Sequence, residues 1–232
     1  MSERIEKILA RELNEPRSRV KTLLQKGQVT VDGVVARAGQ QADPDTQEIC
    51  LAGEPIACRA FVYLMLNKPT GVLSATDGKG EPTVLDLVPS ALRRKGLFPA
   101  GRLDKDTEGL LVITSDGQLA HRIISPKHEV GKVYYERLDG ELTDEDVAAL
   151  EAGIHIRDAD GEFDARPAQI DRDGGDAAYI RVTEGKYHQV KRMIAACSNR
   201  CDGLHRSAFG LYVMPETLKQ GEWGWLTKKD LV

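Results

Sequence analysis

The stretch GRLDKDTEGLLVITSDG, residues 101 to 117, decides how the second part of the chain is interpreted. Its apolar run, residues 109–114, predicts a buried strand, and the polar loop before the run places Asp104 at the entrance to that strand. Two interpretations of Asp104 follow: a surface charge paired with Arg102 or Lys105, or a carboxylate that does chemistry. A short motif in isolation favours the surface charge, because such matches are often accidental. The choice between the two interpretations therefore depends on the rest of the sequence.

The composition is that of an ordinary globular protein. With 232 residues, 41% of them hydrophobic, the chain is long enough for one large or two small domains with buried cores. Its formal net charge of -4 argues against nonspecific nucleic-acid binding by bulk charge. Any basic surface must therefore be local.

Nothing in the sequence predicts a targeting or membrane segment. The N-terminus carries charges throughout and has no apolar core of a signal peptide. The longest apolar run, residues 61–66, is too short to cross a bilayer. We therefore expect a cytoplasmic protein. Its cysteines lack the paired spacing of a zinc site and are expected to be free thiols: Cys50, Cys58, Cys197 and Cys201.

The N-terminal part, residues 1–58, is predicted to be a small domain of its own. Apolar residues at helical spacing predict a first helix that is capped by Ser2 and ends near Asn14. A second helix is expected after Pro16, with Gly27 as its terminating glycine. The Asp32-Gly33 pair between two short apolar runs predicts a β-hairpin.

The second predicted helix is basic, with no acidic residue between Arg17 and Lys26. A charge run of this kind is often only a solvated surface. The segment RSRVKTLLQKGQVTVDG, residues 17–33, nevertheless resembles the S4 RNA-binding domain, and the resemblance extends over residues 2–53. Asp32 stands where that family often has Asn, a change that the turn tolerates. The resemblance implies that RNA is bound by Arg17, Ser18, Arg19, Lys21 and Lys26.

After a predicted linker at residues 52–60, the second domain, residues 59–232, is dominated by strand-like segments. Only two helices are predicted in it, at residues 143–153 and 187–197. The fold class is therefore α+β with a mixed or antiparallel sheet. Residues 139–176 are mostly acidic and should face away from RNA, whereas residues 185–206 are basic.

Four sequence blocks favour a chemical role for Asp104 over a surface charge. They are LNKPTG (66–71), GRLDKDTEGLLVITSDG (101–117), KVYYERL (132–138) and EGKYHQVKRM (184–193). In their order and separation they resemble the RsuA-type family of rRNA pseudouridine synthases. The resemblance implies a bacterial enzyme of ribosome biogenesis that isomerises a uridine, flipped out of its stack, to pseudouridine in ribosomal RNA. It implies no cofactor and no metal, and we expect a monomer. The branch that acts on small-subunit (16S) rRNA is the most similar.

Catalytic roles follow from this resemblance. Asp104 matches the family's catalytic aspartate, and a carboxylate suits attack at an anomeric carbon. Lys186 matches the cation that keeps this aspartate ionised, although many relatives have Arg there. Tyr134 matches the tyrosine that holds the free uracil and assists proton transfer, whereas Tyr135 should pack on the opposite face of its strand. Asp106 is expected to be a loop residue or a local cap.

The remaining site residues have weaker assignments. Lys68 lies in a Pro-Gly turn and is expected at the rim of the RNA cleft, and Arg102 could hold a phosphate or the flipped nucleotide. His188 and Gln189 could orient Lys186 or touch RNA, but a structural histidine is an equal alternative. Two further residues complete the predicted RNA contacts: Lys191 and Arg192.

Three alternatives stay open at this point. The same reaction on large-subunit (23S) rRNA would keep every residue role. A noncatalytic RNA-binding or ribosome-assembly protein could retain the scaffold, although the complete set of Asp104, Tyr134 and Lys186 argues against it. A retaining glycosidase would need a second carboxylate about 5 Å from the first, and it would leave the S4-like segment unexplained.

Overall fold

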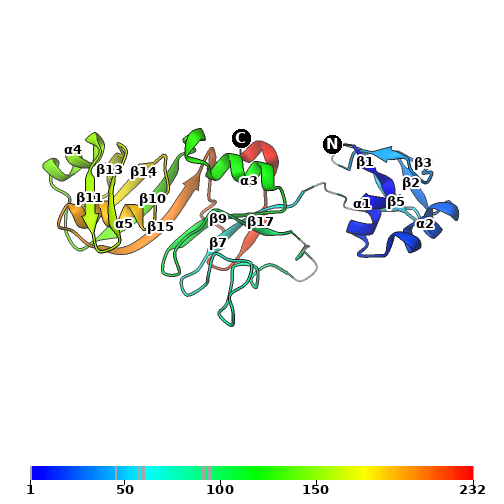
Figure 1. Cartoon of the computed structure of the whole chain (residues 1–232), viewed down its shortest axis with the longest axis horizontal. Helices are drawn as coiled ribbons and strands as arrows, with labels where there is room; N and C mark the ends of the chain where they lie inside the picture. Colours follow the sequence, from blue (N-terminus) through cyan, green and yellow to red (C-terminus); the bar gives the residue numbers. More distant parts are fainter. Residues whose placement is uncertain are drawn as a thin grey trace. The chain divides into compact units, whose positions relative to one another are not determined.

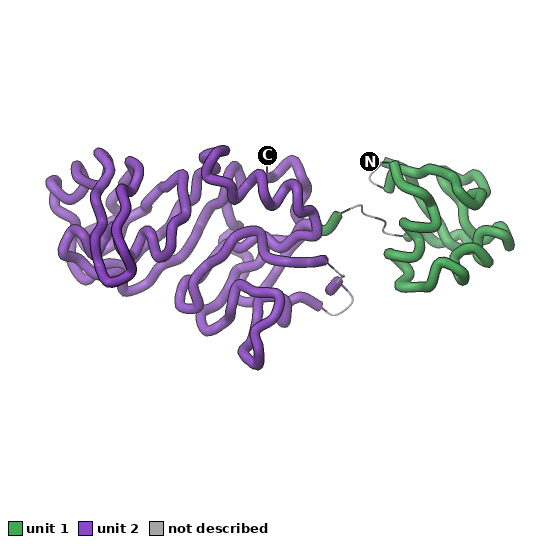
Figure 2. Tube along the Cα trace, in the orientation of Figure 1, with its two compact units in different colours: residues 1–62 green, residues 63–232 purple. Residues whose placement is uncertain are grey.

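The computed structural model describes residues 2–44, 46–56, 58, 61–89, 92–93 and 96–231. The chain forms two compact units, residues 1–62 and 63–232 (Figure 2). Each unit has an apolar core of its own. None of the helices in the described ranges is long and apolar enough to cross a membrane.

In the first unit, helices α1 (Ile5–Glu12) and α2 (Arg17–Gln25) share a core with a four-stranded antiparallel sheet ordered β3-β2-β5-β6 (Figure 1). The strands of this sheet are β2 (Val29–Val31), β3 (Val34–Val35), β5 (Ile49–Leu51) and β6 (Glu54–Pro55). A separate antiparallel pair joins β1 (Glu3–Arg4) to β4 (Gln41–Ala42).

The predicted turns of this unit are confirmed. Helix α2 ends in a Schellman motif, in which the Gly27 N–H donates to Leu24 O and the Gln28 N–H to Leu23 O. Asp32 and Gly33 both have positive φ, 49° and 78°, as the tight hairpin between β2 and β3 requires.

Two predictions for this unit are wrong. Helix α1 begins at Ile5 and not after Ser2, because Glu3–Arg4 pair with β4 as an extended strand. The predicted linker is wrong in its first part, because Glu54–Pro55 pair with β5. The rest of it includes Ala57, Arg59 and Ala60, which lie outside the described residues.

A nine-stranded mixed sheet runs through the described part of the second unit, with a main order of β13-β14-β10-β15-β9-β7-β17 (Figure 1). Short strands β8 and β16 pair with β9 and β15. The bounds are β7 (Tyr63–Lys68), β8 (Phe98–Ala100), β9 (Glu108–Thr114), β10 (Lys132–Leu138), β13 (Gln169–Arg172), β14 (Ala177–Val182), β15 (Cys201–Phe209), β16 (Tyr212–Val213) and β17 (Trp223–Trp225). The mixed-sheet prediction is confirmed.

Strands β9 and β15 run parallel, with Gly109 opposite Arg206, whereas the other strand pairs that the described residues form in this sheet are antiparallel. The backbones approach so closely that a Cβ on Gly109 would lie 2.4 Å from Arg206 O. Gly109 also has φ +100°, which disfavours any side chain. Only glycine therefore fits at this junction of the two halves of the sheet.

Helices α3 (Gly117–Ile124), α4 (Asp144–Ala152) and α5 (Gln189–Ala196) accompany the sheet, together with the β11–β12 hairpin (His155–Asp158 and Gly161–Asp164) and the 3-10 turns η2 (Pro126–His128) and η3 (Lys228–Asp230). The capping box predicted for α4 is confirmed, with Thr143 and Asp146 exchanging bonds. The prediction of only two helices is wrong, because Asp116 caps α3 by accepting from the N–H groups of Gln118 and Leu119.

Candidate functional site

The loop from Gly101 to Thr107 joins β8 to β9 and presents Asp104 at the edge of a pocket of about 430 Å³. Gly101 has φ +88°, so the chain turns sharply as it leaves β8. The Ser74 hydroxyl donates to Leu103 O at 2.7 Å and accepts from its N–H at 3.1 Å. The Asp104 side chain is about one third exposed. It therefore points to solvent from a loop whose backbone is fixed.

Lys68, the last residue of β7, fixes the same loop through hydrogen bonds to its backbone carbonyls. Its side chain is fully buried, and its Nζ lies 2.9 Å from Asp104 O and 2.8 Å from Thr107 O. The carbonyls of Pro69 and Lys105 lie at 3.1 and 3.3 Å. Burial lowers the pKa of Lys68 to about 8, against the opposing charge of Asp104. The prediction that Lys68 lies at the rim of an RNA cleft is wrong, since the ammonium is enclosed by backbone carbonyls.

The basic side chains nearest the Asp104 carboxylate lie on helix α5 and at its N-cap. Lys191 Nζ lies 3.9 Å from Asp104 Oδ2 and 2.6 Å from Asp106 Oδ1. His188 Nε2 lies 3.4 Å from Asp104 Oδ1. The hydrogen bond from Lys191 lowers the pKa of Asp106. Asp106 is thus a loop residue, one of the two alternatives expected for it, and it pairs with Lys191 instead of acting as a local cap.

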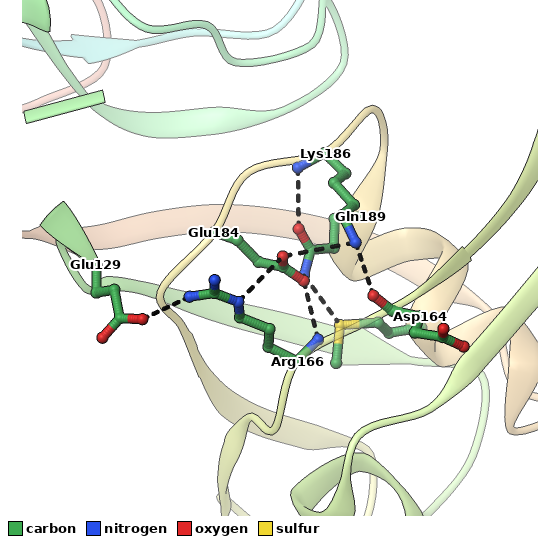
Figure 3. Close-up of polar contacts among 7 residues, drawn as sticks. Glu129, Asp164, Arg166, Glu184, Lys186 and Gln189 are labelled. Carbon is green, nitrogen blue, oxygen red and sulfur yellow. Dashed lines mark hydrogen bonds and ion pairs between the residues drawn. The ribbon is translucent and has the colours of Figure 1, made fainter. Parts of the chain in front are cut away.

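Lys186 is not beside Asp104, which corrects the geometry expected for it. Figure 3 shows its ammonium turned to Asp164, whose backbone O accepts at 2.6 Å, while Glu184 Oε2 lies 3.6 Å away. The ammonium also lies over the Phe163 ring, 4.3 Å from its centroid. Lys186 precedes the tight turn into α5, whereas Lys191 lies on the helix itself. Lys186 therefore contacts Asp164, and Lys191 lies near Asp104.

Glu184 organises this turn (Figure 3). It is buried and accepts hydrogen bonds from the Arg166 N–H at 2.9 Å and from Gln189 Nε2 at 2.7 Å. Gln189 in turn accepts from the Lys186 N–H at 2.9 Å. Gln189 is therefore a buried structural group that orients the Lys186 backbone, one of the two roles expected for it.

Arg192 is also unavailable to a ligand. It is buried, donates to both carboxylate oxygens of Asp158 at 2.7 and 2.8 Å, and contacts Gly161 O. The expectation that Arg192 binds RNA is wrong for this reason. Lys191, by contrast, lines the pocket.

Tyr134 lines the pocket from the centre of β10, where a register shift between Val133 and Tyr134 interrupts the pairing with β15. Only 9% of it is exposed. Tyr135 turns to the other face and packs against Tyr179, with ring centroids 5.0 Å apart, which confirms the packing expected for it. Arg102 is exposed at the pocket and makes no ion pair within the described residues.

Two cations of the pocket were not assigned from the sequence. Lys132 and Arg206 are both buried and lie over the Phe209 ring. Burial, and then the charge of Arg206, lowers the pKa of Lys132 to about 8. Arg206 Nε donates to Leu110 O at 2.8 Å, while one of its terminal nitrogens is buried without a partner among the described residues. Two sequence features could have identified these cations: the K-x-Y spacing for Lys132 and the Leu-His-Arg stretch for Arg206.

In the first unit the residues expected to bind RNA are all exposed on or beside α2: Arg17, Ser18, Arg19, Lys21 and Lys26. Lys7 and Arg11 of helix α1 are paired with Glu3, whereas no ion pair is found for the four cations around α2 within the described ranges. Arg17, Ser18 and Lys21 line a hollow of about 620 Å³. This helix carries free positive charge.

Comparisons with known proteins agree with this arrangement. Residues 62–196 match the family model for RNA pseudouridylate synthase, and residues 3–47 match the S4 domain. An uncharacterised RNA pseudouridine synthase of Bacillus subtilis is 43% identical, over 98% of this chain and 96% of its own length. The ribosomal small subunit pseudouridine synthase A of Vibrio cholerae is 37% identical over 98% and 97%. A crystal structure of a pseudouridylate synthase superposes with a TM-score of 0.67 at 34% identity, covering 98% of this chain and 97% of that one.

Replacing Lys68 with Met tests the loop anchor. The methionine keeps the apolar packing but leaves backbone carbonyls without a donor, so we expect the free energy of unfolding to fall by about 2 kcal/mol. Hydrogen exchange should show lost protection at the Thr107 amide, which donates to Asp104 O. Exposed Lys228→Met is the matched control and should change neither quantity. Wild-type protection in Lys68→Met would refute the anchoring role.

Glu136, two residues after Tyr134, should make stability depend on pH. It is fully buried, and burial raises its pKa to about 7 from an ordinary 4.5. Between these pH values the folded protein keeps a proton that the unfolded chain releases, so the free energy of unfolding should fall as pH rises, by up to about 1.4 kcal/mol per pH unit. Glu136→Gln should lack this loss, while exposed Glu141→Gln should retain it. Parallel denaturation curves for wild type and Glu136→Gln across this range would contradict the assignment.

Proposed function

The chain belongs to the RNA pseudouridine synthase family and carries an S4 domain, and from this premise we propose that it isomerises one uridine of small-subunit (16S) ribosomal RNA, with Asp104 as the nucleophile. The observation that carries the proposal is the fixed Asp104 loop. Its backbone is held by Lys68 and Ser74, and its carboxylate opens onto a pocket that Tyr134 also lines. A nucleophile needs this combination of a rigid backbone and an accessible side chain.

The first chemical step is cleavage of the N-glycosidic bond. Asp104 attacks the flipped nucleotide, and the bond between ribose and uracil breaks while the carboxylate forms the new bond. Lys191 Nζ lies 3.9 Å from one oxygen of this carboxylate and His188 Nε2 lies 3.4 Å from the other, so a cation and a hydrogen-bonding group face the nucleophile. The cation expected from Lys186 is thus supplied by helix α5 in this arrangement.

In the second step the uracil rotates and its C5 bonds to the ribose as the bond to Asp104 breaks. The C5 proton then leaves and N1 gains a proton. Tyr134 offers a ring to hold the free base and a hydroxyl for proton transfer. Arg206 and Lys132 add positive charge to the same pocket, which suits a base that carries negative charge after cleavage. The reaction is an isomerisation, so its atoms balance without a cofactor.

The choice of small-subunit RNA rests on similarity. The Vibrio cholerae relative, 37% identical over nearly the whole chain, is named for that substrate, and the exposed basic residues around α2 suit RNA phosphates. Large-subunit RNA remains the competing substrate of the same reaction, and one experiment separates the two.

That experiment maps pseudouridine in both ribosomal RNAs, naked and partly assembled, after incubation with wild type or Asp104→Asn. Asn keeps the shape of Asp104 but removes its charge, so we expect one new pseudouridine in small-subunit RNA from wild type and none from the variant. RNA binding should be unchanged. Full turnover by Asp104→Asn would refute the nucleophile, and a new pseudouridine only in large-subunit RNA would refute the substrate.

RNA binding by the first unit has a separate test. Replacing Arg17, Arg19 and Lys21 together with Gln should weaken RNA binding and reduce the slope of log Kd against log salt by about 2 to 3 units, because each phosphate contact contributes roughly 0.7 to 0.9. The matched control removes three exposed lysines of the second unit: Lys127, Lys228 and Lys229. Equal salt slopes in both triple variants would argue against a specific role for α2.

A further inference from the structure

The feature that the proposed mechanism leaves unused is an exposed aromatic ring at the pocket, Tyr187. Its ring stacks on that of His188, with centroids 3.8 Å apart and an interplanar angle of 23°. Tyr187 is 59% exposed although it lines the pocket. A large ring left open to water at a binding pocket calls for an explanation that core packing does not provide.

The backbone explains why two consecutive rings stack. Side chains of neighbouring residues in a strand point to opposite faces. His188 instead has a left-handed backbone, with φ 48° and ψ 31°, where it precedes α5 as its N-cap. Because a non-glycine residue adopts this conformation at a cost, the stack is imposed by the surrounding turn, which Glu184 and Gln189 hold together.

The stack is connected to the reacting group. His188 Nε2 lies 3.4 Å from Asp104 Oδ1, and the His188 ring contacts Tyr187. One aromatic face of Tyr187 is therefore covered by His188, one ring removed from Asp104. A pre-oriented ring loses little conformational freedom when a base stacks on it, and such stacking tolerates any base.

We propose that Tyr187 is a stacking platform for the base next to the target uridine, an inference that rests on the proposed function. When that uridine leaves its stack to reach Asp104, its neighbour loses a stacking partner. Tyr187 replaces the partner and keeps the strand open at the pocket. The residue thus binds substrate RNA and takes no part in bond breaking.

The test uses the full chain and a short RNA that spans the mapped uridine, with the nucleotide on either side made abasic in turn. Tyr187→Leu should raise KM about tenfold or more, within the range measured for losing one base stack, and leave kcat within about twofold. Tyr187→Phe keeps the ring and should match wild type. Tyr179→Leu, which removes an exposed ring on the outer face of β14, is the matched control and should also match wild type.

Coupling between protein and RNA distinguishes stacking from a structural role. One abasic position should raise the KM of wild type about tenfold and have less than a twofold further effect on Tyr187→Leu. A wild-type KM for Tyr187→Leu, or independent effects at both flanking positions, would overturn the proposal while leaving the proposed function intact. If wild type forms no pseudouridine in any ribosomal RNA, the stacking proposal and the proposed function are both refuted.

A second measurement does not depend on the leucine variant folding. With 2-aminopurine placed at either flanking position, wild type and Tyr187→Phe should quench its fluorescence at one of the two positions on binding. The absence of quenching at both positions would overturn the platform.

Discussion

The buried ammonium of Lys68 is the constraint on which the pocket depends. A charge taken out of water is costly unless it is well bonded, and here the bonds go to backbone carbonyls of the loop that carries Asp104. The buried ammonium therefore fixes the loop, because the carbonyls of Asp104 and Thr107 must stay in place to keep it hydrogen-bonded. The sequence Lys-Pro-Thr-Gly after an apolar strand is enough to place the lysine where the sheet ends, but it does not reveal which way its side chain points.

Charge around the pocket is arranged in two tiers. The outer tier is Lys191 of helix α5, close to Asp104. The inner tier, Lys132 and Arg206, is buried beside Phe209. Cations in low-dielectric surroundings act strongly on a ligand that carries negative charge. The chain can thus be acidic overall, with a net charge of -4, and still present positive charge to RNA at two local sites.

Much of the architecture could be predicted from local patterns, and the failures share a cause. The Asp32-Gly33 hairpin, the glycine end of α2 and the capping box of α4 are set by residues close in sequence, and all three are confirmed. Strand β15 carries no clear apolar alternation, because its buried positions include Arg206. The partners of Lys68, Lys186 and Arg192 lie 22 to 39 residues away in the chain. Spacing alone does not encode which of several lysines reaches Asp104.

The parallel contact between β9 and β15 has a consequence for how the pocket comes into existence. Gly109 and Arg206 face each other although more than half the length of the second unit separates them along the chain. Strand β10, which carries Tyr134, pairs with β15 along most of its length. Contacts between residues so distant in sequence form late, because a long loop must close first. During synthesis the nascent chain therefore has no pocket until β15 has emerged from the ribosome. Asp104 is synthesised well before β15, so it would stand at an unfinished pocket until that strand pairs.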